Sequence, residues 1–167
     1  MPQRSRALAG DSSGANLAAA TALRARDRGD AGIAFQALLC PALDLVGDFP
    51  SRRLFAHGFG LEPETMSWSM SAYAPDPDLR GRADVSPLRA ASLAGLPPAL
   101  IATAEHDPLR DEGEAYAARL ADAGNAVTAT RHLGAIHFFT DPTRFAAADT
   151  LIDQVAGALR RAGNTGR

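Results

Sequence analysis

Four short apolar runs recur along the chain, with helical stretches between them. The runs occupy residues 6–9, 33–39, 99–104 and 126–131. Runs of this kind, apolar on both faces and alternating with helices, are typical of a parallel sheet that helices cover on both sides. The pattern therefore predicts four buried parallel strands in an α/β fold.

Helices are predicted between and after these strands. The first follows the first strand, over residues 15–28, and the second covers residues 109–123, with Tyr116 and Leu120 on one face. A third is predicted to begin at Asp141-Pro142, because aspartate is a good helix cap and proline suits the first turn. Its expected apolar face carries Leu151, Ile152, Val155 and Leu159, and its expected end is Gly163.

The middle of the chain follows a different pattern. Residues 45–97 hold much proline and no clear strand, and one amphipathic helix is predicted over residues 63–73 with Met66, Met70 and Tyr73 on one face. Met66, Trp68 and Met70 are expected to pack this helix, although such a face can also line a pocket. An insertion of this size between two strands is interpreted as a lid or cap within a single domain, residues 1–167.

Composition narrows the class of protein. The chain has 167 residues, of which 46% are hydrophobic and 22% charged, and its formal net charge is −2. These values are typical of a soluble globular domain, and they favour neither nucleic acid nor an anionic membrane surface as a partner. No apolar run has the length of a membrane span, and the first six residues lack the apolar stretch of a signal peptide.

The single cysteine and the scattered histidines narrow the class of protein further. One cysteine, Cys40, excludes an internal disulfide and favours a reducing compartment, so a cytoplasmic location is expected. We expect its thiol to be buried and inert. The four histidines have no metal-ligand spacing, and no metal or cofactor is predicted.

Candidate chemistry begins at Gly10-Asp11-Ser12-Ser13-Gly14. This Gly-x-Ser-x-Gly pattern follows a small and apolar run from Ser5 and precedes a helix, which is the arrangement of a nucleophile elbow. The two glycines are expected to leave room for a strained turn at Ser12. The backbone N–H of Ser13 is then expected to face a developing oxyanion.

A serine nucleophile needs a histidine base and an acid that orients the histidine. The chain offers Asp107 after the third strand and His137 after the fourth, so both lie at the sheet edge where open α/β folds bind ligands. Asp111 is a nearby rival for the acid, and Asp107 has an alternative role as a helix cap. His106 and His132 are interpreted as surface or structural residues. Glu112 and Glu114 are interpreted as solvated helix charges.

These blocks together resemble the C-terminal part of the hormone-sensitive-lipase-like carboxylesterases of the α/β-hydrolase fold. The elbow is similar to that family's GDSAGGNLA, the run from Asp107 to Gly113 matches its DPLRDEG block, and the run from Gly134 to Phe138 resembles its histidine block. The resemblance implies a partial α/β-hydrolase fold with a half-sheet of about four strands. It also implies Ser12 as nucleophile, His137 as general base and acid, and Asp107 as orienting acid.

Three departures from the family pattern affect what is expected. Ser13 replaces the usual alanine, which keeps the N–H, and Phe138 replaces the glycine usual after the histidine, which crowds that loop. The family's HGGG motif, which completes the oxyanion hole, has no room before Gly10. The segment 57–60 is superficially similar to it and is interpreted as a loop. We therefore expect that the N-terminal half of the enzyme is missing.

Two functions follow from these observations. The first is a carboxylic-ester hydrolase that acts on short-chain esters through an acyl-enzyme, impaired by the loss of oxyanion donors. The second is a non-catalytic fragment that acts as an interaction module or has no function. A small-molecule deacetylase is a further option within the same chemistry. The first strand is expected to be an open edge at which a second copy of the chain could pair.

Overall fold

A four-stranded parallel sheet forms the centre of the computed structural model, which describes residues 6–164. The strands lie in the order β1-β2-β3-β4, the same as their order in the chain. Their bounds are β1 Arg6–Asp11, β2 Ile33–Leu39, β3 Ala99–His106 and β4 Val127–Ile136. All three pairings are parallel. The predicted four-stranded α/β sheet is confirmed, while Ser5, at the start of the predicted elbow strand, lies outside the described residues.

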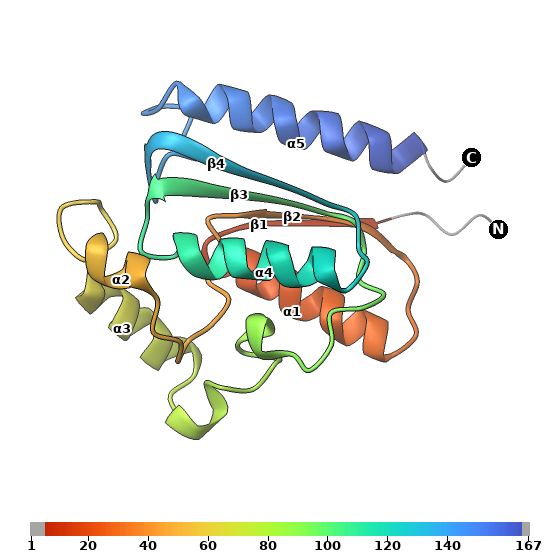
Figure 1. Ribbon diagram of the computed structural model, residues 1–167, viewed down its shortest axis with the longest axis horizontal. Helices are drawn as coiled ribbons and strands as arrows, with labels where there is room; N and C mark the ends of the chain where they lie inside the picture. Colours follow the sequence, from red (N-terminus) through yellow and green to blue (C-terminus); the bar gives the residue numbers. More distant parts are fainter. Residues whose placement is uncertain (1–5, 165–167) are drawn as a thin grey trace.

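Helices cover both faces of the sheet (Figure 1). The helices α1 (Ser13–Asp27) and α4 (Arg110–Asp122) lie on one face, and α5 (Ala147–Asn164) lies on the other. Each crossover from one strand to the next therefore returns the chain in the same direction, so the carboxyl ends of all four strands meet at one edge.

The segment between β2 and β3 holds only short helical elements. They are α2 (Pro50–Leu54), α3 (Pro63–Tyr73) and two 3₁₀ turns, η1 (Pro77–Leu79) and η2 (Pro87–Arg89). The helix α3 has the predicted bounds, and α2 was not predicted. Figure 1 shows α2 and α3 at the end of the sheet where the strands terminate. The cap-like segment therefore lies beside the edge at which the candidate residues were expected.

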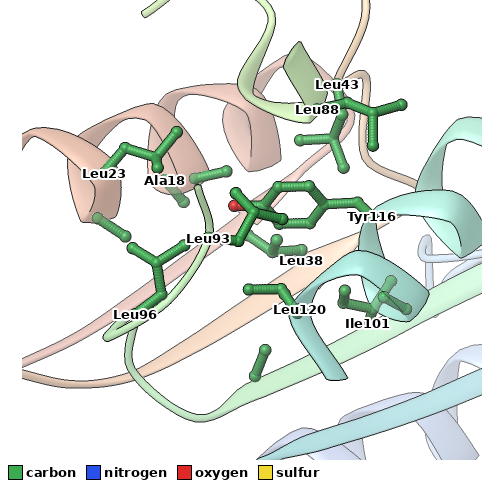
Figure 2. Close-up of a cluster of buried hydrophobic side chains, with 14 of the residues drawn as sticks. Ala18, Leu23, Leu38, Leu43, Leu88, Leu93, Leu96, Ile101, Tyr116 and Leu120 are labelled. Carbon is green, nitrogen blue, oxygen red and sulfur yellow. The ribbon is translucent and has the colours of Figure 1, made fainter. Parts of the chain in front are cut away.

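The main core lies between the sheet and the helices α1 and α4 (Figure 2). Tyr116 and Leu120 of α4 are fully buried there, as predicted, against Leu38 of β2 and Ile101 of β3. Removal of this apolar surface from water is the main favourable contribution to folding. The core therefore fixes α1 and α4, the two helices that follow the candidate residues Ser12 and Asp107.

Only the two inner strands are buried as predicted. Most side chains of β1 and β4 are exposed or half-buried. These strands lie at the two ends of the described sheet, where each has a neighbour on one side only. Position in the sheet, which strand composition does not reveal, decided this burial.

The C-terminal helix begins later than predicted. The segment from Asp141 forms turns, in which the Asp141 carboxylate accepts a hydrogen bond from the Thr143 N–H, and α5 starts at Ala147. The aspartate and proline therefore belong to a turn, for which both residues are equally suited. The buried face of α5 carries Leu151 and Ala158, whereas Ile152 and Leu159 are exposed. Among residues 6–164, no helix is long and apolar enough to cross a membrane.

Candidate active site

Ser12 lies on a strained turn between β1 and α1. Its backbone angles, φ 55° and ψ −115°, fall in a region that side-chain-bearing residues rarely adopt. The Ser12 N–H donates to the Leu39 carbonyl at 2.8 Å, so the turn is fixed against the end of β2. The strain predicted for the elbow is therefore present, and the surrounding structure holds it.

The two elbow glycines differ in what they permit. A Cβ atom at Gly10 would lie 2.2 Å from the backbone of Gly14, so only glycine allows the strand and the helix to approach this closely. A Cβ atom at Gly14 would meet no atom within 4 Å. The expectation that both glycines make room for the turn is therefore correct for Gly10 and wrong for Gly14, which faces open space.

Asp107 is fully buried just past the end of β3. One of its carboxylate oxygens accepts the Leu109 N–H at 2.8 Å, and the other lies 2.9 Å from His137 Nδ1. Because α4 begins at Arg110 and has no side-chain cap, the Asp107 carboxylate closes a turn ahead of this helix. The alternative role of Asp107 as a helix cap is therefore wrong, and its second oxygen contacts the histidine. Asp111, the rival acid, instead accepts a hydrogen bond from the Ser51 N–H and pairs with Arg110.

His137 connects the acid to the serine. The residue follows β4 directly, is 3% exposed, and has its Nε2 atom 2.9 Å from Ser12 Oγ. With Nδ1 beside Asp107, both ring nitrogens have partners. The three sequence-predicted residues, from the ends of three strands, thus form one continuous hydrogen-bonded chain.

The other two histidines near these strands have structural contacts. His132 lies inside β4, which is longer than predicted, and is buried 4.6 Å from the Phe139 ring. Burial lowers its pKa. His106 is half-buried and stacks on Phe59 with ring centroids 5.4 Å apart.

Phe138 packs against the imidazole of His137. The two ring centroids are 5.1 Å apart in an edge-on arrangement, and both hydrogen bonds of His137 are formed. The bulk of Phe138 is accommodated by Gly60, where a Cβ atom would lie 2.9 Å from the phenyl ring. Segment 57–60 is a loop between α2 and α3, as predicted.

Ser13 supplies the first residue of α1. The N–H groups of a first helical turn have no partner within the helix, so that of Ser13 belongs to the free donors at this helix end. The positive end of the helix dipole adds to the attraction for an anion at this point. The expected oxyanion donor therefore lies next to Ser12 at a helix N-terminus.

Cys40 brings a thiol to the acid and the base. It is buried at the end of β2, and its sulfur, a carboxylate oxygen of Asp107 and a ring nitrogen of His137 lie within 4.8 Å of one another. These atoms are possible metal donors that the linear spacing of the sequence did not reveal. Burial, together with the nearby charges of Asp107 and Asp11, raises the pKa of the thiol well above its usual range.

Glu112 is a buried charge that sequence reasoning assigned to solvent. Its side chain is fully buried and pairs with Arg52 at 2.5 Å. Burial raises the pKa of Glu112 from 4.5 to about 7, against the opposing attraction of Arg52 and the hydrogen bonds it accepts. Glu112 lies four and eight residues before Tyr116 and Leu120, so helical spacing on the apolar face was the signal that could have revealed it. Glu114, in contrast, pairs with Arg131 at the surface.

Two hollows meet beside Ser13. The smaller, of about 150 Å³, is lined by Ser12 and Ser13 together with Met66, Arg52 and Glu112. The larger, of about 440 Å³, is mainly apolar and runs along α3 past Trp68 and Tyr73. Trp68 is 73% exposed, so it does not pack α3 into a core as expected. The α3 face instead borders the space next to the serine.

Comparison with known proteins places these features in a family. The model of the family described as the alpha/beta hydrolase fold matches residues 2–141. The chain is 45% identical over 136 residues to the carboxylic ester hydrolase LipN of Mycobacterium tuberculosis, an alignment that covers 78% of this chain and 36% of LipN. It is 36% identical over 138 residues to carboxylesterase NlhH of the same species, covering 81% of this chain and 43% of NlhH.

Solved structures give the same result. A fungal esterase from Rhizomucor miehei matches with a TM-score of 0.90 at 37% identity, over 95% of this chain and 50% of the esterase. A hyperthermophilic esterase from Pyrobaculum calidifontis matches with a TM-score of 0.89 at 39% identity, over 93% of this chain and 52% of that one. The chain therefore spans about half the length of these solved esterases, and the expected partial hydrolase fold is confirmed.

Proposed function

The chain belongs to the family of the α/β hydrolase fold, and from this premise we propose that it hydrolyses carboxylic esters through an acyl-enzyme formed on Ser12. The observation that carries the proposal is the hydrogen-bonded chain from Ser12 through His137 to Asp107, with both contacts at 2.9 Å. The names of the relatives, which are ester hydrolases, support the same class of reaction.

Each residue has a role that its contacts support. Ser12 Oγ attacks the ester carbonyl carbon while His137 Nε2 takes its proton, and the buried Asp107 carboxylate stabilises the imidazolium that forms. The tetrahedral intermediate carries an oxyanion that the Ser13 N–H and the α1 N-terminus stabilise. His137 then returns the proton to the leaving alcohol. A water molecule, activated by the same histidine, releases the acid from Ser12.

The hollows support a short, uncharged ester as substrate. The small hollow next to Ser12 has a volume of about 150 Å³, which suits a short acyl group. The apolar hollow along α3 offers space to the alcohol part. We therefore propose residues 45–97, which contribute α3, as the cap of the site.

A second candidate, a non-catalytic fragment, rests on the number of oxyanion donors. The described residues offer the α1 N-terminus as the donor group next to Ser12, and the chain spans 36% of LipN. Because loss of a single oxyanion donor costs roughly 10²–10³ in rate, a site with few donors would be slow. The two candidates differ in one measurable property, which is turnover that depends on Ser12.

Hydrolysis of p-nitrophenyl acetate by the purified chain tests the proposal. Ser12→Ala should lower kcat by about 10³-fold or more, because it removes the nucleophile. Ser67→Ala, which alters an exposed serine of α3, should leave kcat unchanged. An alkyl fluorophosphonate should add one adduct to the wild type and none to Ser12→Ala by mass spectrometry. Equal hydrolysis rates for the wild type and Ser12→Ala would overturn the proposal in favour of the fragment.

A further inference from the structure

The buried carboxylate of Glu112 links the two loops that hold the candidate active site. We infer that Glu112 is a positioning residue: it fixes the loop behind Ser12 relative to the turn that carries Asp107. The inference rests on the proposed function, because it assigns Glu112 a part in the same reaction. It does not require contact between Glu112 and the ester.

The first half of this link joins Glu112 to the loop after β2. Its Oε1 atom accepts the N–H groups of Leu43 at 2.6 Å and Asp44 at 3.1 Å. Its Oε2 atom accepts from Arg52 Nε at 3.1 Å and from Nη2 at 2.5 Å. Arg52 in turn donates to the carbonyls of Asp44 and Gly47. The carboxylate and the guanidinium together therefore hold the main chain of this loop from both its N–H and its carbonyl groups.

The same loop supports the main chain of the nucleophile turn. The Ala42 N–H donates to the Ser12 carbonyl at 3.3 Å, and the Asn16 side chain donates to the Ala42 carbonyl at 2.7 Å. The Ser12 N–H in turn donates to the carbonyl of Leu39, the last residue of β2 before this loop. A displacement at Leu43 and Asp44 is therefore transmitted to Ser12 through directly bonded neighbours.

The second half of the link lies at the start of α4, which begins at Arg110. The Gly113 N–H, next to Glu112, donates to the Leu109 carbonyl, and the Leu109 N–H donates to the Asp107 carboxylate. Glu112 and Asp107 are thus held by one short turn. The buried side chain of Glu112 therefore joins the loop behind the nucleophile to the loop of the acid.

The position of β1 makes such a link important. The strand β1, which leads into Ser12, lies at the edge of the described sheet and pairs with β2 alone. Its turn is strained, and strain persists only where neighbouring contacts over-determine the conformation. Burying a charge costs free energy that a neutral side chain of similar size would not. The buried ion pair of Glu112 and Arg52 is therefore better explained by a role in the geometry of the site than by a contribution to stability.

Kinetics of Glu112→Gln, at a pH where Glu112 is ionised in the wild type, test the inference. The amide keeps the shape of the side chain and places a donor group against the donors of Arg52. We expect kcat for p-nitrophenyl acetate to fall about tenfold or more, since small displacements of reacting groups cost that much, with KM little changed. Glu112→Gln/Arg52→Met, which removes the opposed donors, should recover part of kcat. Glu114→Gln breaks an exposed ion pair on the same helix and should leave kcat unchanged.

Amide hydrogen exchange gives a second measurement that needs no catalysis. In Glu112→Gln the Ser12 and Ala42 amides should exchange about tenfold faster than in the wild type, because their loop is less constrained. The amides of the inner strand β3 should be unchanged, as should all of these amides in Glu114→Gln. If Glu112→Gln does not fold, Arg52→Gln alters the same contact from its more exposed partner.

The outcomes separate the two proposals. A wild type without Ser12-dependent turnover overturns the proposed function, and the exchange rates then decide the inference alone. Unchanged exchange at Ser12 and Ala42 in Glu112→Gln overturns the inference whatever the activity. In an active wild type, a rise in KM at constant kcat would overturn it as well, because it would assign Glu112 to substrate binding.

Discussion

The replacement Glu112→Gln should change how the stability of the fold depends on pH. The glutamine side chain resembles the protonated carboxyl and does not titrate. In the wild type, burial raises the pKa of Glu112 from 4.5 to about 7 in the folded chain. The folded chain therefore binds more protons than the unfolded chain between these two values. Stability contributed by this group is fully present below pH 4.5 and is lost as the pH rises through 7.

The magnitude follows from the two pKa values. A shift from 4.5 to about 7, at 1.36 kcal/mol for each unit, corresponds to about 3 kcal/mol. The free energy of unfolding of the wild type minus that of Glu112→Gln should therefore fall by about 3 kcal/mol between the two ends of this window. Relative to the wild type, Glu112→Gln should therefore lose the least stability, or gain stability, above pH 7.

Urea unfolding followed by circular dichroism measures this difference. Urea titrations of both proteins are carried out at one pH below 4.5 and at one pH above 7. The other titrating groups are shared by the two proteins, so their contributions cancel in the comparison. Glu114→Gln serves as the control, because it removes a carboxylate from the same helix whose ion pair with Arg131 lies at the surface. A wild-type advantage that is constant or grows as the pH rises would refute the reasoning, since it would mean that Arg52 outweighs burial.

Three further predictions follow from the packing and the sheet order. Gly10→Ala places a methyl group 2.2 Å from the backbone of Gly14. We therefore expect either loss of folding, measured by circular dichroism, or loss of fluorophosphonate labelling of Ser12, measured by mass spectrometry. Normal folding with full labelling would contradict this. Leu38→Ala empties a fully buried position beneath α1 and α4 and should lower the free energy of unfolding by about 2–5 kcal/mol in urea titrations. A loss below about 1 kcal/mol would show that the site collapses around the change. The open edge of β1 predicts self-association, which Ala9→Pro should weaken, because proline removes an N–H from the edge; size-exclusion chromatography that shows a monomer for the wild type would contradict this.

Local patterns in the sequence predicted the four strands, most of the helices and the three candidate site residues. The elbow from Gly10 to Gly14 needs a strand before it and a helix after it, and both are visible in neighbouring residues. Asp107 and His137 follow apolar runs, and parallel strands place their carboxyl ends at one edge. The sequence therefore predicted that these residues lie at one edge of the sheet, and only the structure shows that their side chains are in contact.

Other features depend on neighbours that are distant along the chain. Glu112 looks like a solvated helix charge from its sequence, and its partners Leu43, Asp44 and Arg52 lie about 60 to 70 positions away. Cys40 has no metal-ligand spacing, yet the ends of β2, β3 and β4 bring it beside Asp107 and His137. No local pattern contains such pairs, because burial and partnership are properties of the packed sheet.

By itself the sequence determined the four strands and the strained elbow, because each depends on the conformation of a few consecutive residues. It also supplied Ser12, Asp107 and His137 as candidate site residues, through their positions after the strands and the resemblance of their blocks to a known family. Only the tertiary structure decided which strands are exposed, where α5 begins and which charge is buried. Those outcomes depend on strand order and on contacts across the sheet, where the free energy of burial is set by all the surrounding elements together.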